Sequence, residues 1–314
     1  MRVFVAGGSG AIGRHLIPAL IADGHEVAAS TRSAGKSAYL AATGAAPVVM
    51  DGLDREAILA AVQKAAPEVI VHQMTSLGIT KDFRRFDEEF AVTNELRTRG
   101  TDYLLEAARR AGTRRFIAQS FTGFTNQYAG TPVKTEDDPL NPDPPASARQ
   151  TLAAIRYVDE TVPEQAPEGI VLRYGLFYGH GASNGTLSAV RAGTFPVIGG
   201  GTGIWSFCEI TDAAAAAAAS VTRGAPGIYN IVDDEPAPAA EWVPFLARCL
   251  GAEAPGEIPV WIGRELAGEF LVAQMTIARG SSNAKAKREL LWAPRYATWR
   301  DGFGEWVKSE CAPR

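Results

Sequence analysis

The chain has 314 residues, of which 46% are hydrophobic and 21% are charged. These values are typical of a folded globular protein and argue against a disordered chain, a coiled coil or a fibre. At roughly 150 residues per domain, the length predicts two lobes. The formal net charge of −4 provides no positive field, so nucleic acid is not an expected partner.

Neither a membrane partner nor a metal is expected. No stretch approaches the roughly 20 consecutive apolar residues that a membrane span needs. The first six residues lead directly into a glycine-rich loop, so we expect no secretion signal and a cytoplasmic protein. The three cysteines lie far apart, which fits a reducing compartment, and the four histidines form no His-x-x-x-His pair.

Strand and helix patterns alternate over the first part of the chain. Strands are predicted at residues 2–6, 25–30, 47–50, 68–72, 115–119 and 169–174, and helices at 11–22, 55–65, 94–111 and 148–162. This alternation requires crossover helices and therefore a parallel sheet. We predict an α/β fold with a doubly wound (Rossmann) parallel sheet of six strands.

The pattern becomes irregular after residue 175, where Gly and Pro interrupt it often. We therefore predict one domain over residues 1–175 and a smaller, mainly substrate-binding lobe over 176–314. Segments near 204–232, including a strand at 204–209, are expected to return to the first domain. Sheets of this kind bind ligands outside the carboxyl ends of their strands, so the cleft is expected there.

Three glycines, Gly7, Gly10 and Gly13, lie three residues apart between the first predicted strand and helix. In a dinucleotide-binding loop, the first glycine allows a tight turn and the second lets the backbone approach a pyrophosphate. The third allows the helix to pack closely on the strand. The spacing therefore predicts dinucleotide binding, and the alternative is a glycine-rich turn without a ligand.

The end of the second strand predicts which dinucleotide is bound. NAD sites usually carry an acid there that accepts from the ribose 2′-hydroxyl, whereas an Arg accommodates a 2′-phosphate. This chain has Arg32, with Lys36 nearby and no acid. NADP is therefore the expected cofactor and NAD the alternative, unless Arg32 is only a solvated surface residue.

These motifs resemble the extended short-chain dehydrogenase/reductase family, also called the NAD-dependent epimerase/dehydratase family. Further matches follow in order at residues 51–53, 72–74, 94, 172–179 and 282–294. The resemblance implies a nicotinamide cofactor. It assigns cofactor binding to Gly7, Gly10, Ala11, Ile12, Gly13, Arg32, Asp51, Gly52, Leu53, Gln73, Met74, Asn94 and Tyr174.

The chain departs from this family at the residues that carry its chemistry. The family uses a Tyr-x-x-x-Lys pair, in which Tyr transfers a proton and Lys lowers its pKa and binds the nicotinamide ribose. None of the eight tyrosines here has Lys four residues later. Aligning Glu160 with the family's Glu places Leu152 and Arg156 at the pair, and counting from upstream prolines gives Ala146 and Gln150.

The end of the fifth strand is also altered. Phe121 takes the place of the family's catalytic Ser or Thr, between Ser120 and Thr122. We predict Ser120, Thr122 and Arg156 as the catalytic candidates, although both hydroxyls could instead bond their own backbone. The proline-rich segment 131–145 is either a lid carrying Lys134 or an inert connection.

The combined pattern predicts an atypical NAD(P)-dependent oxidoreductase that acts on a small or glycosylated metabolite. Without the Tyr–Lys pair, its substrates should need little protonation. The alternatives are a non-redox isomerase, cyclase or dehydratase with a prosthetic nucleotide, and a nucleotide-binding regulatory or sensor protein. A small-molecule substrate is the expected partner, and a homodimer is the expectation from base rates.

Overall fold

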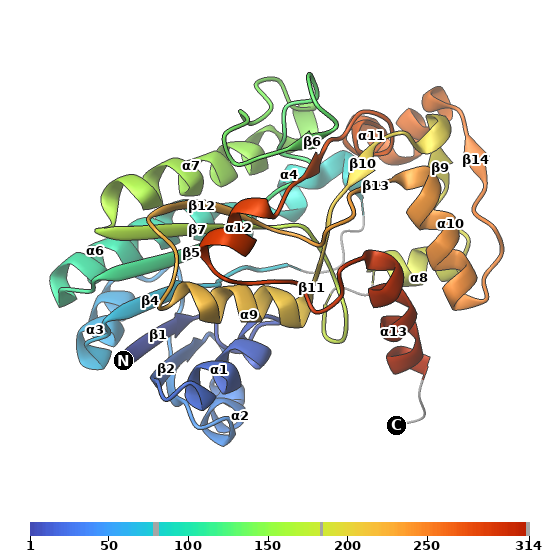
Figure 1. Cartoon of the computed structure of the whole chain (residues 1–314). Coiled ribbons are helices and arrows are strands. Elements are labelled where there is room, and N and C mark those ends of the chain that lie inside the picture. Colours follow the sequence, from blue (N-terminus) through green and yellow to red (C-terminus); the bar gives the residue numbers. More distant parts are fainter. Residues whose placement is uncertain (78–81, 183–184, 312–314) are drawn as a thin grey trace.

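The computed structural model describes residues 1–77, 82–182 and 185–311, and its centre is a parallel sheet of seven strands (Figure 1). The strand order is β12-β7-β5-β4-β1-β2-β3, which confirms the doubly wound prediction. The strands are β1 (Arg2–Ala6), β2 (Glu26–Thr31), β3 (Ala46–Val49), β4 (Val69–His72), β5 (Arg115–Phe121), β7 (Glu168–Tyr174) and β12 (Gly227–Ile231).

The prediction of six strands was wrong by one, because β12 returns from the second half of the chain and pairs with β7. Strand β12 follows α9 (Ile210–Ser220), which covers one face of the sheet, and it lies within the segment 204–232. No strand was predicted at residues 227–231.

Helices cover both faces of the sheet, as the alternation of its side chains requires. In β1, Val3 and Val5 face one apolar core, whereas Phe4 and Ala6 face the other. The first core is covered by α1 (Gly13–Ala22), α2 (Ser37–Ala42), α9 (Ile210–Ser220) and α12 (Ala284–Glu289). The second is covered by α3 (Arg55–Ala65), α6 (Thr101–Ala111) and α7 (Arg149–Gln165), and α5 (Ala91–Glu95) packs against α7.

Local signals explain where some helices begin and end. Helix α3 has the predicted bounds, because the Asp54 side chain accepts from the Ala57 N–H at 3.1 Å and caps its first turn. The predicted helix over 94–111 is interrupted, since a π-helical turn, Leu96–Gly100, separates α5 from α6. Turns of this kind are rare and often occur at functional sites.

The second lobe packs beside the carboxyl ends of the strands, at the right of Figure 1. Its helices are α8 (Gly185–Arg191), α10 (Ala239–Leu250), α11 (Val260–Thr276) and α13 (Trp299–Cys311), whereas α4 (Phe86–Glu89) contacts α7 of the first domain. Its core contains Trp242 and Trp299. No helix in the described ranges is long and apolar enough to cross a membrane.

Short strand pairs connect the lobes and the loops. The pairs are β8 (Leu176–Tyr178) with β11 (Phe207–Glu209), β9 (Val197–Ile198) with β14 (Glu257–Ile258), β10 (Ile204–Trp205) with β13 (Ala237–Pro238), and β6 (Val133–Lys134) with β15 (Gly280–Ser281). The single strand predicted at 204–209 is therefore divided at Ser206. Its two halves have different partners.

A buried carboxyl group follows β12. The side chain of Asp233 is only 3% exposed. Its Oδ1 accepts from the Glu235 N–H at 3.3 Å, whereas its Oδ2 has no partner among the described residues. Burial raises the pKa of Asp233 to about 8 from the ordinary value of 3.8. The native state therefore holds this proton at pH values where the unfolded chain has lost it.

We expect Asp233→Asn to be stabilised relative to the wild type as the pH rises. Between the two pKa values only the native carboxyl binds the proton, so its contribution to stability falls by about 1.4 kcal/mol per pH unit. The free energy of unfolding of both proteins in urea at several pH values checks this. Asp137→Asn, at an exposed position, is the control. If the free energies of unfolding of the wild type and Asp233→Asn differed by the same amount at every pH, the raised pKa of Asp233 would be contradicted.

Candidate active site

The glycine loop connects β1 to α1 and is attached to the end of β2. The Gly7 N–H donates to Ser30 Oγ at 3.0 Å, and the Gly8 N–H donates to the Ser30 carbonyl at 2.8 Å. Gly7 has a φ of +90°, and a Cβ there would lie 2.8 Å from the Gln73 carbonyl oxygen. Only glycine fits this position, because side chains are strained at such φ values.

The other two glycines of the motif have different environments. A Cβ on Gly13 would lie 2.2 Å from the Gly8 carbonyl oxygen, so Gly13 is required for the close approach of α1 to the loop. Gly10 is exposed, and a Cβ there would meet only the Gly7 carbonyl oxygen, at 3.2 Å. The loop therefore leaves an open face at Gly10, beside Ala11, Ile12 and the start of α1. A dinucleotide pyrophosphate fits this arrangement.

Cationic side chains lie near the loop at the end of β2. Buried Thr31 shares a hydrogen bond of 2.9 Å with Ser9 of the loop, and Arg32 follows it with its side chain exposed. A pocket of about 290 Å³ adjoins them, lined by Ser9, Arg14, Lys36 and Tyr39. Two cations and a hydroxyl at one pocket can hold an anionic group.

The predicted adenine-side residues lie at the end of β3. Asp51 is exposed, and its Oδ1 accepts from the Leu53 N–H at 3.0 Å, which fixes the turn. Gly52 is buried, and a Cβ there would lie 2.6 Å from Met74 Sδ and 2.7 Å from Leu96 Cδ2. The structure thus brings Asp51, Gly52, Leu53 and Met74 together.

The turn after β4 is ordered by His72. Its Nδ1 accepts from the Met74 N–H at 3.2 Å, so its Nε2 carries the hydrogen and donates to the Leu96 carbonyl at 3.3 Å. Burial lowers the pKa of His72 to about 4, which keeps the ring neutral at physiological pH. Gln73 Nε2 donates to the Tyr174 hydroxyl at 3.2 Å, whereas Gln73 Oε1 has no partner in the described ranges.

Helix α7 presents a buried stripe, Thr151, Ile155 and Asp159, at four-residue spacing. Asn94 Nδ2 donates to Thr151 Oγ1 at 3.0 Å, and Arg173 Nε donates to Asp159 Oδ2 at 2.9 Å. The sequence alignment used Glu160, which is exposed. Anchoring it instead on buried Asp159 would place Thr151 and Ile155 at the family's Tyr and Lys positions, so the pair is absent in this register too.

The three predicted catalytic residues are not brought to one point. Arg156 is half-buried beside the stripe and donates through Nη2 to the Asn141 carbonyl at 3.1 Å. Ser120 is buried near Asp159, and Thr122 Oγ1 shares a hydrogen bond of 2.7 Å with Ser281 Oγ in β15. Their part in a reaction stays a prediction.

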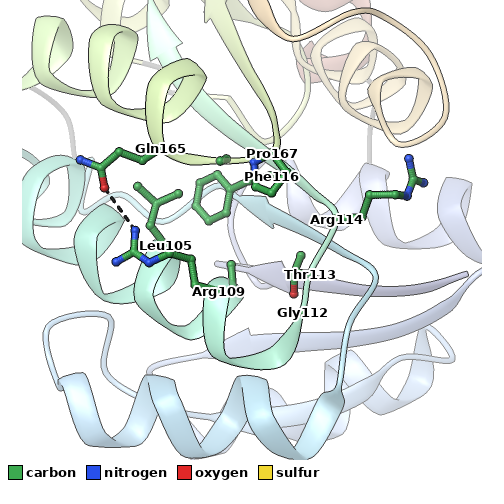
Figure 2. Close-up of a pocket in the computed structure, with 10 residues that line it drawn as sticks. Leu105, Arg109, Gly112, Thr113, Arg114, Phe116, Gln165 and Pro167 are labelled. Atoms are coloured by element: carbon green, nitrogen blue, oxygen red, sulfur yellow. Dashed lines mark hydrogen bonds between the residues drawn. The ribbon is translucent and has the colours of Figure 1, made fainter.

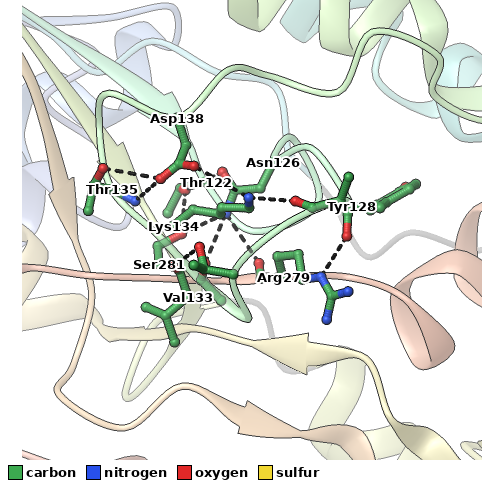
Figure 3. Close-up of polar contacts among 12 residues, drawn as sticks. Thr122, Asn126, Tyr128, Val133, Lys134, Thr135, Asp138, Arg279 and Ser281 are labelled. Carbon is green, nitrogen blue, oxygen red and sulfur yellow. Dashed lines mark hydrogen bonds and ion pairs between the residues drawn. The ribbon is translucent and has the colours of Figure 1, made fainter.

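Thr122 belongs to a network that attaches the 122–145 loop to β15 (Figure 3). Asn126 Nδ2 donates to Ser281 Oγ at 2.9 Å. Buried Lys134 donates to the Ala129 carbonyl at 2.6 Å and pairs with Asp138 at 3.3 Å. Lys134 therefore holds its own loop together and offers no cation to the cleft.

An aromatic cluster lies at the end of β5, and the sequence analysis missed it. The Phe121 ring lies 4.8 Å from that of Phe124. Phe86 stacks on Phe90 at 4.3 Å and on Phe270 of α11 at 4.1 Å. The available signal was the helical spacing of Phe83, Phe86 and Phe90, but their contact with α11 depends on the tertiary fold.

A pocket of about 300 Å³ lies at the amino-terminal ends of β5 and β7, away from these residues (Figure 2). Leu105, Phe116 and Pro167 contribute apolar surface, and Arg109 donates to Gln165 at 3.3 Å. Ligands of doubly wound sheets bind at the opposite edge, so we do not place the active site here.

Comparison with known proteins agrees with this geometry. Residues 3–232 match the family model described as the NAD dependent epimerase/dehydratase family. The chain belongs to this family. A relative from a Streptomyces species, 3-diazoavenalumate denitrifying reductase, is 45% identical over 311 residues, covering 97% of this chain and 99% of the relative. The chain is accordingly an oxidoreductase with a nicotinamide cofactor.

A second relative and two solved structures are more distant. A ketoreductase of a farnesylated dihydroquinoline oxide from Stigmatella aurantiaca is 29% identical, over 86% of this chain and 80% of its own. The UDP-glucose 4-epimerase of Thermotoga maritima has a TM-score of 0.75 at 21% identity, covering 98% of each chain. A human epimerase family protein with NADPH has a TM-score of 0.72 at 20% identity, covering 98% and 99%. These structures share the fold.

Proposed function

We propose that this protein is an NADP-dependent reductase that replaces the diazo group of an aryl substrate by hydrogen. The observation that carries the proposal is the lack of a strong general acid in the expected reaction region. In the register anchored on Asp159, Phe121, Thr151 and Ile155 stand at the family's catalytic Ser or Thr, Tyr and Lys positions. The name of the Streptomyces relative supplies the substrate class, since it describes a reductase that removes diazo nitrogen.

The chemistry of an aryl diazonium ion fits a site without a general acid. A carbonyl oxygen becomes negative as hydride arrives and needs a proton donor, whereas a diazonium ion is already positive and loses N2. The reduced nicotinamide supplies hydride when bound, so that Ar–N2⁺ and hydride give Ar–H and N2, with the C–N bond broken and a C–H bond formed. The Phe121 and Phe124 rings offer aromatic surface for such a substrate.

NADP is the proposed form of the cofactor because of the cations near the loop. Arg32 is exposed at the end of β2, and Arg14 and Lys36 line the adjoining pocket. A 2′-phosphate would place two negative charges near these three side chains, and guanidinium groups bind phosphate through paired N–H donors.

We expect NADP(H) to bind more tightly than NAD(H) by about 1–3 kcal/mol, the range of a charge-assisted hydrogen bond. Arg32→Ala should remove most of this difference, while Arg109→Ala, at the opposite edge of the sheet, should not change it. Calorimetric titration with both nucleotides measures the effect. Equal affinities in the wild type would contradict the NADP assignment.

The function itself is tested with the purified protein, NADPH and ¹⁵N-labelled aryl diazonium compounds. We expect one equivalent of labelled N2, measured by mass spectrometry, for each NADPH oxidised, together with the arene in which hydrogen replaces nitrogen. Reactions without protein, or with NADP⁺ instead of NADPH, are the controls. Release of N2 without NADPH oxidation, or no reaction across several aryl diazo compounds, would contradict the proposal.

A further inference from the structure

Arg97 is a buried cation, and two of its nitrogen atoms have no hydrogen-bond acceptor in the described part of the chain. It lies on the π-helical turn between α5 and α6, and its side chain is 5% exposed. Its Nε and Nη1 atoms have no partner among the described residues. Burial lowers the pKa of Arg97 to about 10, so the group is still charged at neutral pH. A buried charge without partners destabilises a protein, and this points to a ligand that supplies the acceptors.

The neighbouring acid does not satisfy Arg97. Asp159 lies close enough to attract it, but the guanidinium that donates a hydrogen bond to this carboxylate, at 2.9 Å, is that of Arg173, through Nε. Two guanidinium groups therefore act on the Asp159 carboxylate, and the second acid near Arg173, Glu136, accepts from the Asn230 N–H at 2.7 Å. The stripe residue between Asp159 and Thr151 is Ile155, which has no polar atom in its side chain.

The position of Arg97 in the fold identifies the part of the cofactor that it faces. The glycine loop follows β1, and the Arg32 and Lys36 cations follow β2, so the adenosine half lies over β1, β2 and β3. The other half must then cross to β4 and β5, where the strand order reverses. Arg97 acts electrostatically on His72, the last residue of β4, and its turn packs against α7.

We propose that Arg97 binds the ribose of the nicotinamide half through its unpaired N–H groups. This rests on the dinucleotide site of the proposed function but not on the diazo substrate. Asn94 lies three residues earlier, and its Oδ1 also has no partner in the described part of the chain. Arg97 donates and Asn94 Oδ1 accepts, which matches ribose hydroxyls, because each hydroxyl both accepts and donates. The cation of the site thus comes from the π-helical turn instead of α7.

The test compares two nucleotides on two variants. NADP⁺ contains the nicotinamide ribose, whereas 2′,5′-ADP contains only the phosphorylated adenosine half. We expect Arg97→Met to weaken NADP⁺ binding by about tenfold or more, the size of one lost hydrogen bond from a charged group. The affinity for 2′,5′-ADP should not change. Arg97→Lys keeps the charge, so its affinity for NADP⁺ should lie between those of the wild type and Arg97→Met. Calorimetry measures all these affinities.

Thermal unfolding without nucleotide distinguishes a binding role from a structural one. We expect Arg97→Met to be at least as stable as the wild type, because it removes an unpaired buried charge. Unchanged NADP⁺ affinity would overturn the proposal, as would parallel losses for both nucleotides with a lower melting temperature. If the wild-type protein binds NAD⁺ rather than NADP⁺, the NADP assignment is wrong. The role of Arg97 is then tested by comparing the protein's affinities for NAD⁺, which contains the nicotinamide ribose, and AMP, which does not.

Discussion

Gly10→Val is expected to abolish dinucleotide binding while leaving the protein folded. Gly10 is exposed, its φ is not in the left-handed region, and a Cβ there meets only the Gly7 carbonyl oxygen at 3.2 Å. The branched side chain would therefore occupy the open face beside the start of α1, where the pyrophosphate is proposed to lie. We expect affinity to fall by more than about 100-fold, measured by calorimetry and by the loss of nucleotide-dependent thermal stabilisation.

Gly13→Ala is the matched control from the same loop. Its Cβ would lie 2.2 Å from the Gly8 carbonyl oxygen, so the helix start or the loop must move. We expect this variant to unfold at a lower temperature even without nucleotide, whereas Gly10→Val should not. If Gly10→Val were still stabilised by nucleotide as the wild type is, the phosphates would lie elsewhere.

The parts of the fold that depend on local periodicity could be predicted from the sequence. Strand β1, helix α3 and the positions along the chain of the first six sheet strands follow from alternation and helical spacing. A return of the chain near 204–232 was expected, but the strand at 227–231 and its pairing with β7 were not predicted, because that pairing depends on the tertiary fold. The π-helical turn at Leu96–Gly100 was also missed, since it leaves the helical pattern of the sequence nearly unchanged.

The candidate site also has parts that could be predicted from the sequence and parts that could not. The glycine loop could be recognised because its three functions depend on residues within one short segment. The buried face of α7 could not, since Asp159 and Glu160 are adjacent acids and only the contact of Asp159 with Arg173 selects one of them. The burial of Arg97 could not be predicted either, because it follows from the packing of the π-helical turn against α7, which no local pattern reports.

The protein is expected to show negligible epimerase or dehydratase activity on nucleotide sugars. Those reactions in the family depend on the Tyr–Lys pair, and general acid–base catalysis contributes about 10²–10⁴-fold to rate. Here Phe121, Thr151 and Ile155 offer no group of comparable acidity. With UDP-glucose and dTDP-glucose, we expect turnover at least about 100-fold below the typical value of ~10 per second.

Chromatography of the sugar nucleotides, with NADPH absorbance recorded alongside, measures this turnover. The aryl diazo compound of the proposed function, assayed with the same preparation, is the positive control. A Ser120→Ala, Arg156→Gln double variant should reduce the diazo compound within a few-fold of the wild type, because that reaction takes no proton from the protein. Turnover near ~10 per second on either sugar would mean that an acid–base group is present after all. A large loss of diazo reduction in the double variant would mean that Ser120 or Arg156 takes part in the reaction.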